Sequence, residues 1–393
     1  MCPTDGDLFF EEQSDTSRRK IEVYGKYLRP LAYKLLSGRY NRLWIVDAYA
    51  GAGAYDPDAE GKRAEGSPLA AANIARQYNV DAASRGKQIG LINVEANSAR
   101  FAKLEQTLMG FAPAVTNIRG RFQDQLDRIL EMVGADPALF FIDPFGMDGA
   151  ALPVIDRILE RRSKTVTELL INFSHRGFQR MAGNLDASAK SPAAKAAART
   201  KVESLNAILD TTFWQGAWRN LDLSPEQKLD QVADLYAERL RARGIEEVHP
   251  IHMRDSWDSP TAYRMFFATR SPHGVYLMSD IVAAYERGLF QQRFEGTFEL
   301  QWETERRTRA MDELRDEVHA FGLASQGARP IDVFLHFAPI HFGEWTQTDY
   351  MNCLRELVRR GGIQRNGSSG IEQREMLTFS PIAQGDLFGA GAG

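Results

Sequence analysis

Short apolar runs alternate with helical segments over the first half of the chain, and three of these runs end in an acidic residue. Because they lack the polar alternation of a half-exposed strand, each predicts a strand buried on both faces of a sheet. A helix after each strand predicts parallel pairing, and therefore an α/β fold with a doubly wound, Rossmann-like sheet. The runs are Arg42–Asp47, Gln88–Glu95, Val115–Arg119, Ala138–Asp143 and Glu168–Phe173.

The pattern changes after Phe173. Residues 174–224 are rich in Ala, Lys and Arg, and we interpret them as a helical insertion. Two further strands are predicted at Glu247–Met253 and Tyr263–Thr269, and the turn-containing stretch between them favours an antiparallel pair. A parallel sheet that ends in one antiparallel hairpin is typical of S-adenosylmethionine-dependent methyltransferases, and the pattern leaves other α/β strand orders open.

The chain divides into a large α/β part and a small C-terminal part. Helical runs and short strands around a turn at Asn366–Gly370 predict a winged-helix-like domain, and the Gly-Ala tail is predicted to be disordered. A long loop is predicted at Tyr55–Glu65. The predicted segments are an N-terminal helical segment (1–38), a methyltransferase-like domain (39–290), a linker helix (291–324), the winged-helix-like domain (325–380) and the tail (381–393).

Composition narrows the class of protein. With 393 residues, 25% of them charged and 44% hydrophobic, the chain has the profile of a globular protein, which excludes wholesale disorder. Two cysteines exclude a disulfide framework or a zinc cluster and suit a reducing, cytoplasmic location; we expect no metal site. No apolar run is long enough to span a bilayer. The net charge of −4 argues against a globally basic nucleic-acid binder and leaves a local basic surface open.

The stretch IVDAYAGAG after the first strand is a candidate ligand loop. Glycine lets backbone approach a ligand closely, so Ala48, Gly51 and Gly53 are candidate cofactor contacts. A dinucleotide fingerprint needs a third glycine and an immediate helix, but Asp56 stands at the third position, so an NAD site fits poorly. The acid before the glycines, Asp47, instead suits a ligand with a cationic amino-acid end, such as S-adenosylmethionine. A generic tight turn is the alternative.

Glu95 closes the second strand. An acid at that place can accept both ribose hydroxyls of a bound nucleoside, although its separation from Asp47 exceeds the roughly 20 residues usual in dinucleotide folds. A solvated strand end is the alternative. Glu95 is a candidate ligand contact because it lies beside Asp47 at the carboxyl edge of the predicted sheet, where open α/β sheets bind ligands.

The stretch FFIDPFGM follows the third acidic strand end. Asp143 supplies a side-chain acceptor next to the backbone carbonyl of Pro144, and such a pair can hold both hydrogens of an exocyclic amine. Phe145 is placed to stack on a flat base. Attack on a sulfonium needs alignment more than a strong base, so this is catalysis by positioning. A strand that simply ends in a proline turn is the alternative.

Basic residues predict where a nucleic acid would make contact. His175, Arg176 and Arg180 follow the strand ELLINF and are candidates for contact with substrate phosphates. The Lys- and Ala-rich run at Lys190–Lys201 is either a solvated helix face or a phosphate contact. In the winged-helix candidate, four arginines either follow a nucleic-acid backbone or face a protein partner; they are Arg355, Arg359, Arg360 and Arg365.

The motifs AYAGAGAY, EGSPL, FFIDPFG, ELLINF and YRMFFATRSPHG, in this order, resemble the three-Cys-motif partner proteins (TcmP) over residues 15–290. More distantly they are similar to bacterial adenine-N6 methyltransferases of ribosomal RNA. The resemblance implies a class I methyltransferase fold, S-adenosylmethionine as cofactor, and a three-cysteine, radical-S-adenosylmethionine-like protein of phage-associated type as partner.

The resemblance also assigns roles to residues. It places Asp47, Gly51 and Gly53 around the methionine part of the cofactor and Glu95 on its ribose. It matches Asp143, Pro144 and Phe145 to the D-P-P-[YF] segment of amino-methyltransferases. The chain departs from that segment, because its aromatic ring stands one place early and Gly146 occupies the position of the stacking ring.

Two hypotheses of different classes follow. The first is a methyltransferase that transfers a methyl group from S-adenosylmethionine to an amine of a nucleic-acid base and works with a partner protein. The second is a methyltransferase-like scaffold without activity that binds a protein or nucleic acid, which Gly146 favours. An oxidoreductase is disfavoured by the incomplete glycine fingerprint.

Overall fold

The computed structural model describes residues 15–57, 63–82, 86–161, 165–186, 191–365 and 370–382. The chain separates into two compact units, Met1–Ser271 and Pro272–Gly393. Sequence analysis places this boundary near residue 290, so the observed division differs by one helix, α11 (Pro272–Phe294), which belongs to the second unit. Within the described ranges, no helix has both the length and the apolar composition that a bilayer crossing requires.

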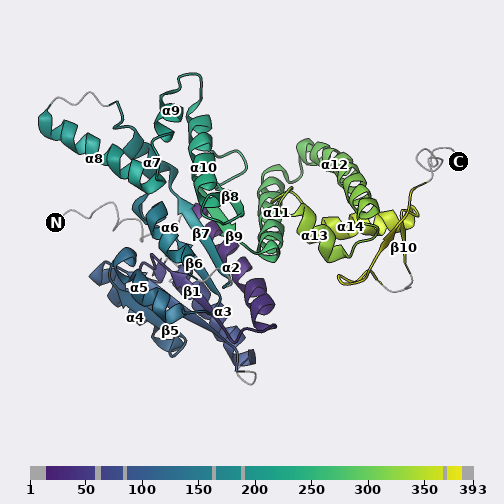
Figure 1. Ribbon diagram of the computed structural model, residues 1–393, viewed down its shortest axis with the longest axis horizontal. Helices are drawn as coiled ribbons and strands as arrows, with labels where there is room; N and C mark the ends of the chain where they lie inside the picture. Colours follow the sequence, from purple (N-terminus) through teal and green to yellow (C-terminus); the bar gives the residue numbers. More distant parts are fainter. Residues whose placement is uncertain are drawn as a thin grey trace. The chain divides into compact units, whose positions relative to one another are not determined.

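The first unit is built on a seven-stranded sheet in the order β5-β4-β1-β6-β7-β9-β8 (Figure 1). The first five strands in this order pair in parallel, and β9 runs antiparallel to both of its neighbours. The predicted α/β sheet and its antiparallel pair are thus confirmed. The strands are β1 (Arg42–Asp47), β4 (Gln88–Glu95), β5 (Val115–Arg119), β6 (Ala138–Ile142), β7 (Thr167–Phe173), β8 (Glu247–Met253) and β9 (Tyr263–Thr269).

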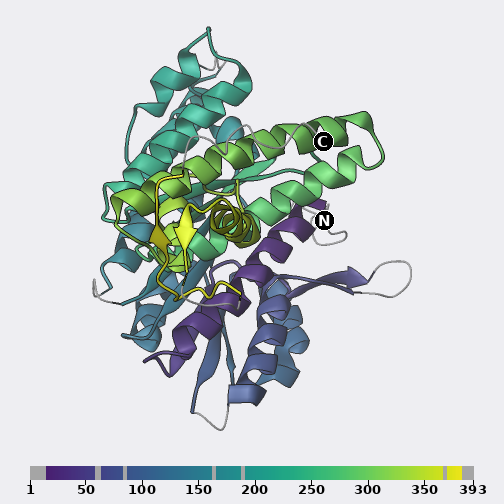
Figure 2. The ribbon, with the colours of Figure 1, turned by 90° about the vertical axis from the view of Figure 1, so that its right-hand side faces the viewer.

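Helices cover both faces of this sheet. On one face, α5 (Phe122–Val133), α6 (Leu152–Leu159) and α10 (Pro225–Arg241) share one apolar core with the strands. On the other face, α3 (Ser67–Ala82) packs against β4 and against α2 (Asp15–Leu36), as Figure 2 shows. The helix α4 (Ser98–Leu108) lies beside α3 and the edge strand β5. Burial on both faces explains why the strands read as continuous apolar runs.

The helix α2 is held to the sheet by two tyrosines. The ring of Tyr24 stacks on Phe141 of β6, with ring centroids 4.5 Å apart. The Tyr27 hydroxyl donates a hydrogen bond of 2.6 Å to Glu168, which is buried within β7. Burial raises the pKa of Glu168 to about 7, and the hydrogen bonds it accepts oppose that shift. The buried stripe of this helix also includes a lysine, Lys20, which lies one turn before Tyr24.

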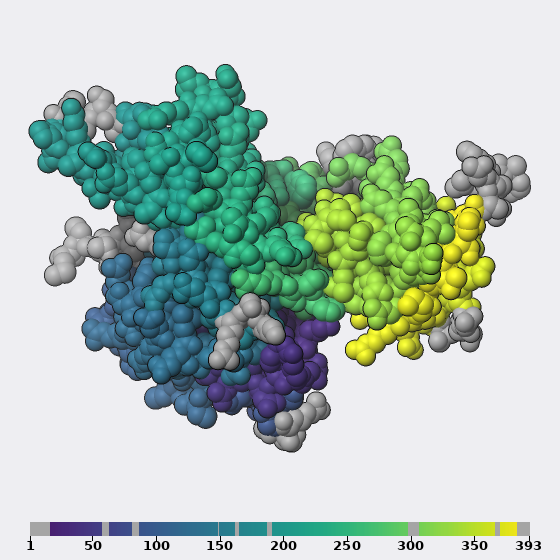
Figure 3. Space-filling model, viewed as in Figure 1, coloured from purple at the N-terminus to yellow at the C-terminus, as the bar shows by residue number. Residues whose placement is uncertain are grey.

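Two segments differ from or refine the prediction. The expected loop Tyr55–Glu65 contains a short antiparallel hairpin, β2 (Ala54–Pro57) and β3 (Arg63–Glu65), beside α3 (Figure 2). The insertion is helical, with α7 (His175–Ala182), α8 (Pro192–Leu209) and α9 (Trp214–Arg219). The first half of α8 is exposed and stands out from the rest of the unit (Figure 3), because its Ala and Lys residues offer no large apolar side chain to bury.

The second unit packs four helices around a separate apolar core that includes Val318, Phe334 and Leu354. Two short strands pair in an antiparallel manner after the last helix. The helices and strands expected for a winged-helix-like segment are present, and that name stays a prediction; most of its turn and of the tail lies outside the described residues. Besides α11, the elements are α12 (Phe298–Ala324), α13 (Pro330–Phe337), α14 (Gln347–Arg359), β10 (Ile363–Gln364) and β11 (Thr378–Phe379).

Tyr27→Phe should lower the free energy of unfolding by about 1–3 kcal/mol, because it removes a donor from a buried carboxyl group. Urea denaturation measures the change. The matched control is Tyr33→Phe on the same helix, since the Tyr33 side chain is 62% exposed and its loss of a hydroxyl should be close to neutral. Equal effects of the two substitutions would contradict the anchoring role of Tyr27.

Candidate functional site

A cavity of about 880 Å³ opens at the carboxyl edge of the parallel strands in the first unit. The loops that follow β1, β4, β5, β6 and β7 all contribute to its wall, and α2 and the β8–β9 connection complete it. This is where open α/β sheets bind ligands, because the carboxyl ends of parallel strands meet there. The predicted residues in its wall are Ala48, Gly51, Gly53, Glu95, Asp143, Pro144, Phe145, Arg176 and Arg180.

The glycine loop after β1 brings bare backbone to the cavity. Gly51 and Gly53 have φ angles of 60° and 82°, in the left-handed region that glycine adopts without strain. A Cβ atom on Gly53 would lie 3.0 Å from Leu104 Cδ1, so this residue is also confined by packing against α4. Both requirements explain why glycines stand at these positions.

Glu95 fastens the glycine loop. One carboxylate oxygen accepts a 3.0 Å hydrogen bond from the Gly51 amide, and the other accepts one of 2.6 Å from the Asn97 amide. Glu95 is only 8% exposed, yet it lines the cavity. Since each carboxylate oxygen can accept more than one hydrogen bond, Glu95 retains acceptor capacity toward a ligand.

Asp47 lies behind the cavity wall. It is 1% exposed, and its Oδ1 accepts a 3.1 Å hydrogen bond from the Tyr49 amide. Its Oδ2 is buried without a hydrogen-bond partner among the described residues. Burial raises the pKa of Asp47 to about 7; the Ser67 hydroxyl and the Tyr49 amide oppose the shift.

Asp143 is held from both sides. Lys20 of α2 forms an ion pair with Oδ2, and the Asn172 amide nitrogen donates a 2.6 Å hydrogen bond to Oδ1. The β6–β7 register pairs Ile142 with Ile171, which brings the next residue of each strand side by side. The Lys20 side chain is 8% exposed and lies 5.3 Å from the centre of the Tyr263 ring. The charge at this strand end is therefore compensated within the protein.

The segment after Asp143 is exposed at Phe145, whereas Pro144 is buried. Phe145 is 54% exposed and belongs to the cavity wall. Gly146 has open space around the position of a missing Cβ atom. An exposed ring at a cavity mouth is a stacking platform for a flat ligand.

Exposed arginines surround the same cavity. Arg121, Arg176 and Arg180 are exposed, and no acidic side chain of the described residues pairs with them. Arg176 is placed by α7, whose first turn is capped when the Ser174 hydroxyl accepts from the Gly177 amide. The cavity mouth is therefore positively charged although the chain as a whole is slightly acidic.

His175 is a structural residue, which corrects the expectation that it contacts substrate. It is 3% exposed, and its Nδ1 donates to the Thr261 carbonyl oxygen at 3.2 Å. Its Nε2 accepts a 2.8 Å hydrogen bond from the buried guanidinium of Arg264. Burial, followed by the charge of Arg264, lowers the pKa of His175 to about 4, so the ring is neutral at physiological pH.

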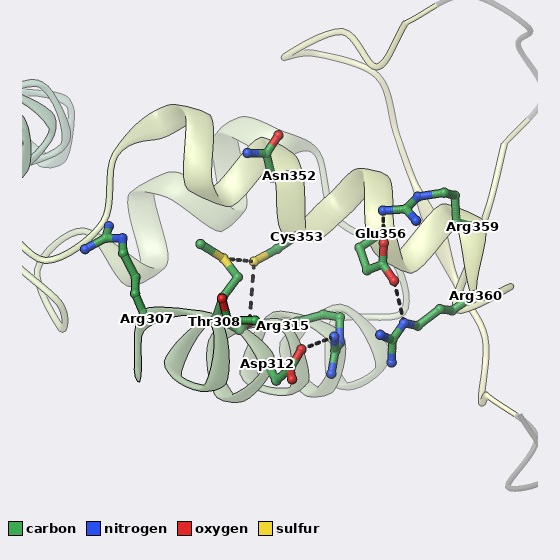
Figure 4. A pocket seen from close by; sticks show the side chains of 10 residues that line it. Arg307, Thr308, Asp312, Arg315, Asn352, Cys353, Glu356, Arg359 and Arg360 are labelled. Atoms are coloured by element: carbon green, nitrogen blue, oxygen red, sulfur yellow. Dashed lines mark hydrogen bonds and ion pairs between the residues drawn. The ribbon is translucent and has the colours of Figure 1, made fainter. Parts of the chain in front are cut away.

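A second cavity, of about 410 Å³, lies between α12 and α14 in the second unit (Figure 4). Its arginines are paired with acids of the same helices. Arg359 and Arg360 both bind Glu356, and Arg315 binds Asp312 at 2.6 Å. Two other predicted phosphate contacts are also engaged, since Arg355 donates to Asn352 and Arg365 binds Glu375. This surface offers less free positive charge than the cavity of the first unit.

Lys20 and Asn172 are among the residues of the site that escaped the sequence analysis. In both cases the sequence holds a polar residue within an apolar pattern, which is recognisable once the structure is known. Lys20 interrupts the buried stripe of a helix, four residues before Tyr24, and Asn172 is the polar residue in the otherwise apolar end of ELLINF. A buried polar residue in an apolar pattern indicates a specific partner.

No protein-family model and no curated protein matches the chain. Among solved structures, a Legionella pneumophila protein of family-model DUF519 gives a TM-score of 0.40 at 12% identity, covering 70% of this chain and 95% of that one. An O-methyltransferase from Bacillus cereus in complex with SAH gives 0.31 at 12% identity over 68% and 92%. The O-methyltransferase TomG from Streptomyces achromogenes in complex with SAM gives 0.32 at 14% identity over 67% and 91%. Because each TM-score lies below 0.5, the fold assignment rests on the strand order of this chain.

Asp47→Asn should flatten the pH dependence of stability. Between about pH 4 and pH 7 the folded chain keeps a proton on Asp47 that the unfolded chain releases, so stability from this group falls as the pH rises through that window. The variant keeps the acceptor for the Tyr49 amide and does not titrate. The free energy of unfolding of Asp47→Asn minus that of wild type should rise by about 2–4 kcal/mol from pH 4 to pH 7.5. Urea denaturation at each pH measures it.

The matched control is Asp222→Asn, because Asp222 is exposed. Glu168 titrates in wild type and in both variants, so its contribution cancels in the comparison. A profile for Asp47→Asn that is parallel to that of wild type would show that the Asp47 carboxyl group is not perturbed.

Proposed function

We propose that the protein is an S-adenosylmethionine-dependent methyltransferase that acts on an exocyclic amine of a nucleic-acid base. The observation that carries this proposal is the single cavity in whose wall the glycine loop, Glu95 and the Asp143–Phe145 segment lie together. These groups come from three different strand ends. A structural turn would not require them to converge on one space.

The polar groups around the cavity fit the cofactor. The buried carboxyl group of Asp47, behind the glycine loop, suits a nearby cationic amino group, and the spare acceptor capacity of Glu95 suits the ribose hydroxyls. The backbone of Gly51 and Gly53 leaves room for the part of the cofactor that links its amino group to its ribose. When bound, S-adenosylmethionine supplies an electrophilic methyl group on a sulfonium.

The residues near Asp143 would hold the methyl acceptor. Phe145 offers a ring for stacking a base, and the polar groups at the end of β6 lie beside it. Because transfer from a sulfonium depends on in-line alignment, the protein would contribute mainly by fixing the amine in position. Arg121, Arg176 and Arg180 would contact the phosphates that flank the base.

Membership of the three-Cys-motif partner family, and a radical-S-adenosylmethionine-like partner, are proposed from the sequence motifs alone. The exposed first half of α8 is a surface on which a partner could act. A cytoplasmic location is likewise a proposal from the low cysteine content.

A scaffold without activity is the second candidate function, and one observation favours it. Lys20 and Asn172 occupy the two oxygens of Asp143, and Gly146 stands where amino-methyltransferases carry the stacking ring. A protein of this kind would bind its partner or nucleic acid without transferring a methyl group.

Calorimetric titration with S-adenosylmethionine separates the two functions. Wild type should bind, and Glu95→Ala should weaken binding by about tenfold to a hundredfold, because two acceptors for the ribose and the fastening of Gly51 are lost. Asp143→Asn should keep cofactor affinity within about threefold and lose methyl transfer to nucleic acid. Absence of binding by wild type at millimolar ligand would contradict the enzyme, and loss of affinity in Asp143→Asn would contradict its assigned role.

The arginines predict a salt-dependent interaction with nucleic acid. Binding of a single-stranded RNA oligonucleotide, followed by fluorescence anisotropy, should weaken steeply with added salt. Arg176→Ala and Arg180→Ala should each reduce the slope by about one phosphate contact, whereas Arg29→Ala, an exposed arginine outside the cavity wall, should not. A flat salt response would point to a protein or small-molecule substrate.

A further inference from the structure

We infer that the side-chain oxygen of Asn172 is the group that holds the N–H of the acceptor amine, and that Asp143 acts as a positioning residue behind it. This inference rests on the proposed function and refines it. It identifies the atom that discriminates between a base with an exocyclic amine and a base with a carbonyl oxygen at the same position.

The orientation of the Asn172 amide is fixed by its neighbour. Its nitrogen lies 2.6 Å from Asp143 Oδ1, and an ionised carboxylate is only an acceptor. The amide oxygen cannot occupy that place without facing another acceptor, so the nitrogen must point at Asp143. The oxygen is consequently directed away from Asp143.

That oxygen has no partner within the protein. Asn172 is 7% exposed, its Oδ1 is buried, and no described residue donates a hydrogen bond to it. Leaving a buried acceptor unpaired is costly, so such an atom indicates a partner from outside the chain. Asn172 also belongs to the cavity wall, together with Asp143, Pro144 and Phe145.

The oxygens of Asp143 are already engaged, which makes Asn172 the freer acceptor. Lys20, on α2, donates to Oδ2 of Asp143, and the Asn172 amide nitrogen donates to Oδ1. Lys20, Asp143 and Asn172 therefore form a chain of interactions that ends in the unpaired oxygen of a residue in the cavity wall. The ion pair and the hydrogen bond lock the amide, so that its oxygen is presented in one orientation.

An amide oxygen in this place selects a donor. It favours a base with an exocyclic amine and disfavours one with a carbonyl oxygen at the same position, because two acceptors would then face each other without a proton between them. Buried polar groups discriminate strongly against a ligand that leaves them unpaired. The substrate class is accordingly an amine-bearing base, adenine or cytosine, rather than hypoxanthine or uracil.

The test uses pairs of nucleotides that differ in this group. Protein saturated with S-adenosylhomocysteine is titrated with AMP against IMP and with CMP against UMP. Wild type should bind the amine-bearing member of one pair at least about tenfold more tightly than its counterpart. Asn172→Thr should reduce this ratio to within about twofold, since the amide oxygen is gone while a β-branched residue suits strand β7.

Two controls separate this role from a structural one. Asn93→Ala removes an asparagine of similar burial on β4, one whose amide nitrogen donates to Asn117 and which is not part of the cavity wall, and should leave the ratio unchanged. Binding of S-adenosylhomocysteine by each variant reports that the site is folded, and Asn172→Ser serves if the threonine variant does not bind it.

The outcomes distinguish this inference from the proposed function. If wild type binds the cofactor and prefers an amine, and Asn172→Thr keeps the preference, this inference is overturned and Asp143 or Pro144 is the acceptor. If wild type binds the cofactor but prefers neither nucleotide of a pair, this inference is overturned while the cofactor site stands. If wild type binds no cofactor, the proposed function and this inference fail together.

Discussion

Parallel pairing of the first five strands is the constraint on which the rest of the first unit depends. Because all five carboxyl ends meet at one edge, five loops far apart in the sequence share one cavity. The same pairing buries the strands on both faces, which requires helices on each side. The helix α2 meets this requirement on one face and, in doing so, carries Lys20 to the strand ends.

Buried charge gives this edge its chemical character. Asp47, Asp143 and Lys20 interact with one another where little water reaches them, and Lys20 and Asp143 form a direct ion pair that leaves Asp47 outside it. Such groups are costly to bury unless each has a partner. Asp47 Oδ2 and Asn172 Oδ1 have none among the described residues, and both lie at or just behind the cavity wall. The unmatched acceptors are the strongest indication that a ligand with donors belongs there.

The two cavities differ in how their arginines are used. In the second unit Glu356 and Asp312 form ion pairs with three of the arginines in the wall, and such partly exposed pairs contribute little to stability. In the first unit Arg121, Arg176 and Arg180 remain available to anions. A nearly neutral chain can thus present exposed arginines in one place, because no acid of the described residues pairs with them there.

The sequence by itself determined the strands, their parallel direction and the acidic strand ends, because apolar runs and helix spacing are local signals that burial on both faces imposes. It also identified the glycine loop, Glu95 and the Asp143–Phe145 segment as one group. Only the tertiary structure decided that a short hairpin occupies the expected loop, that His175 is buried, and that Asp47 lies behind the wall rather than in it. It alone joined Lys20 to Asp143 and left Asn172 Oδ1 unpaired, because these contacts link residues more than 25 positions apart and depend on strand register and helix packing, which no local pattern records.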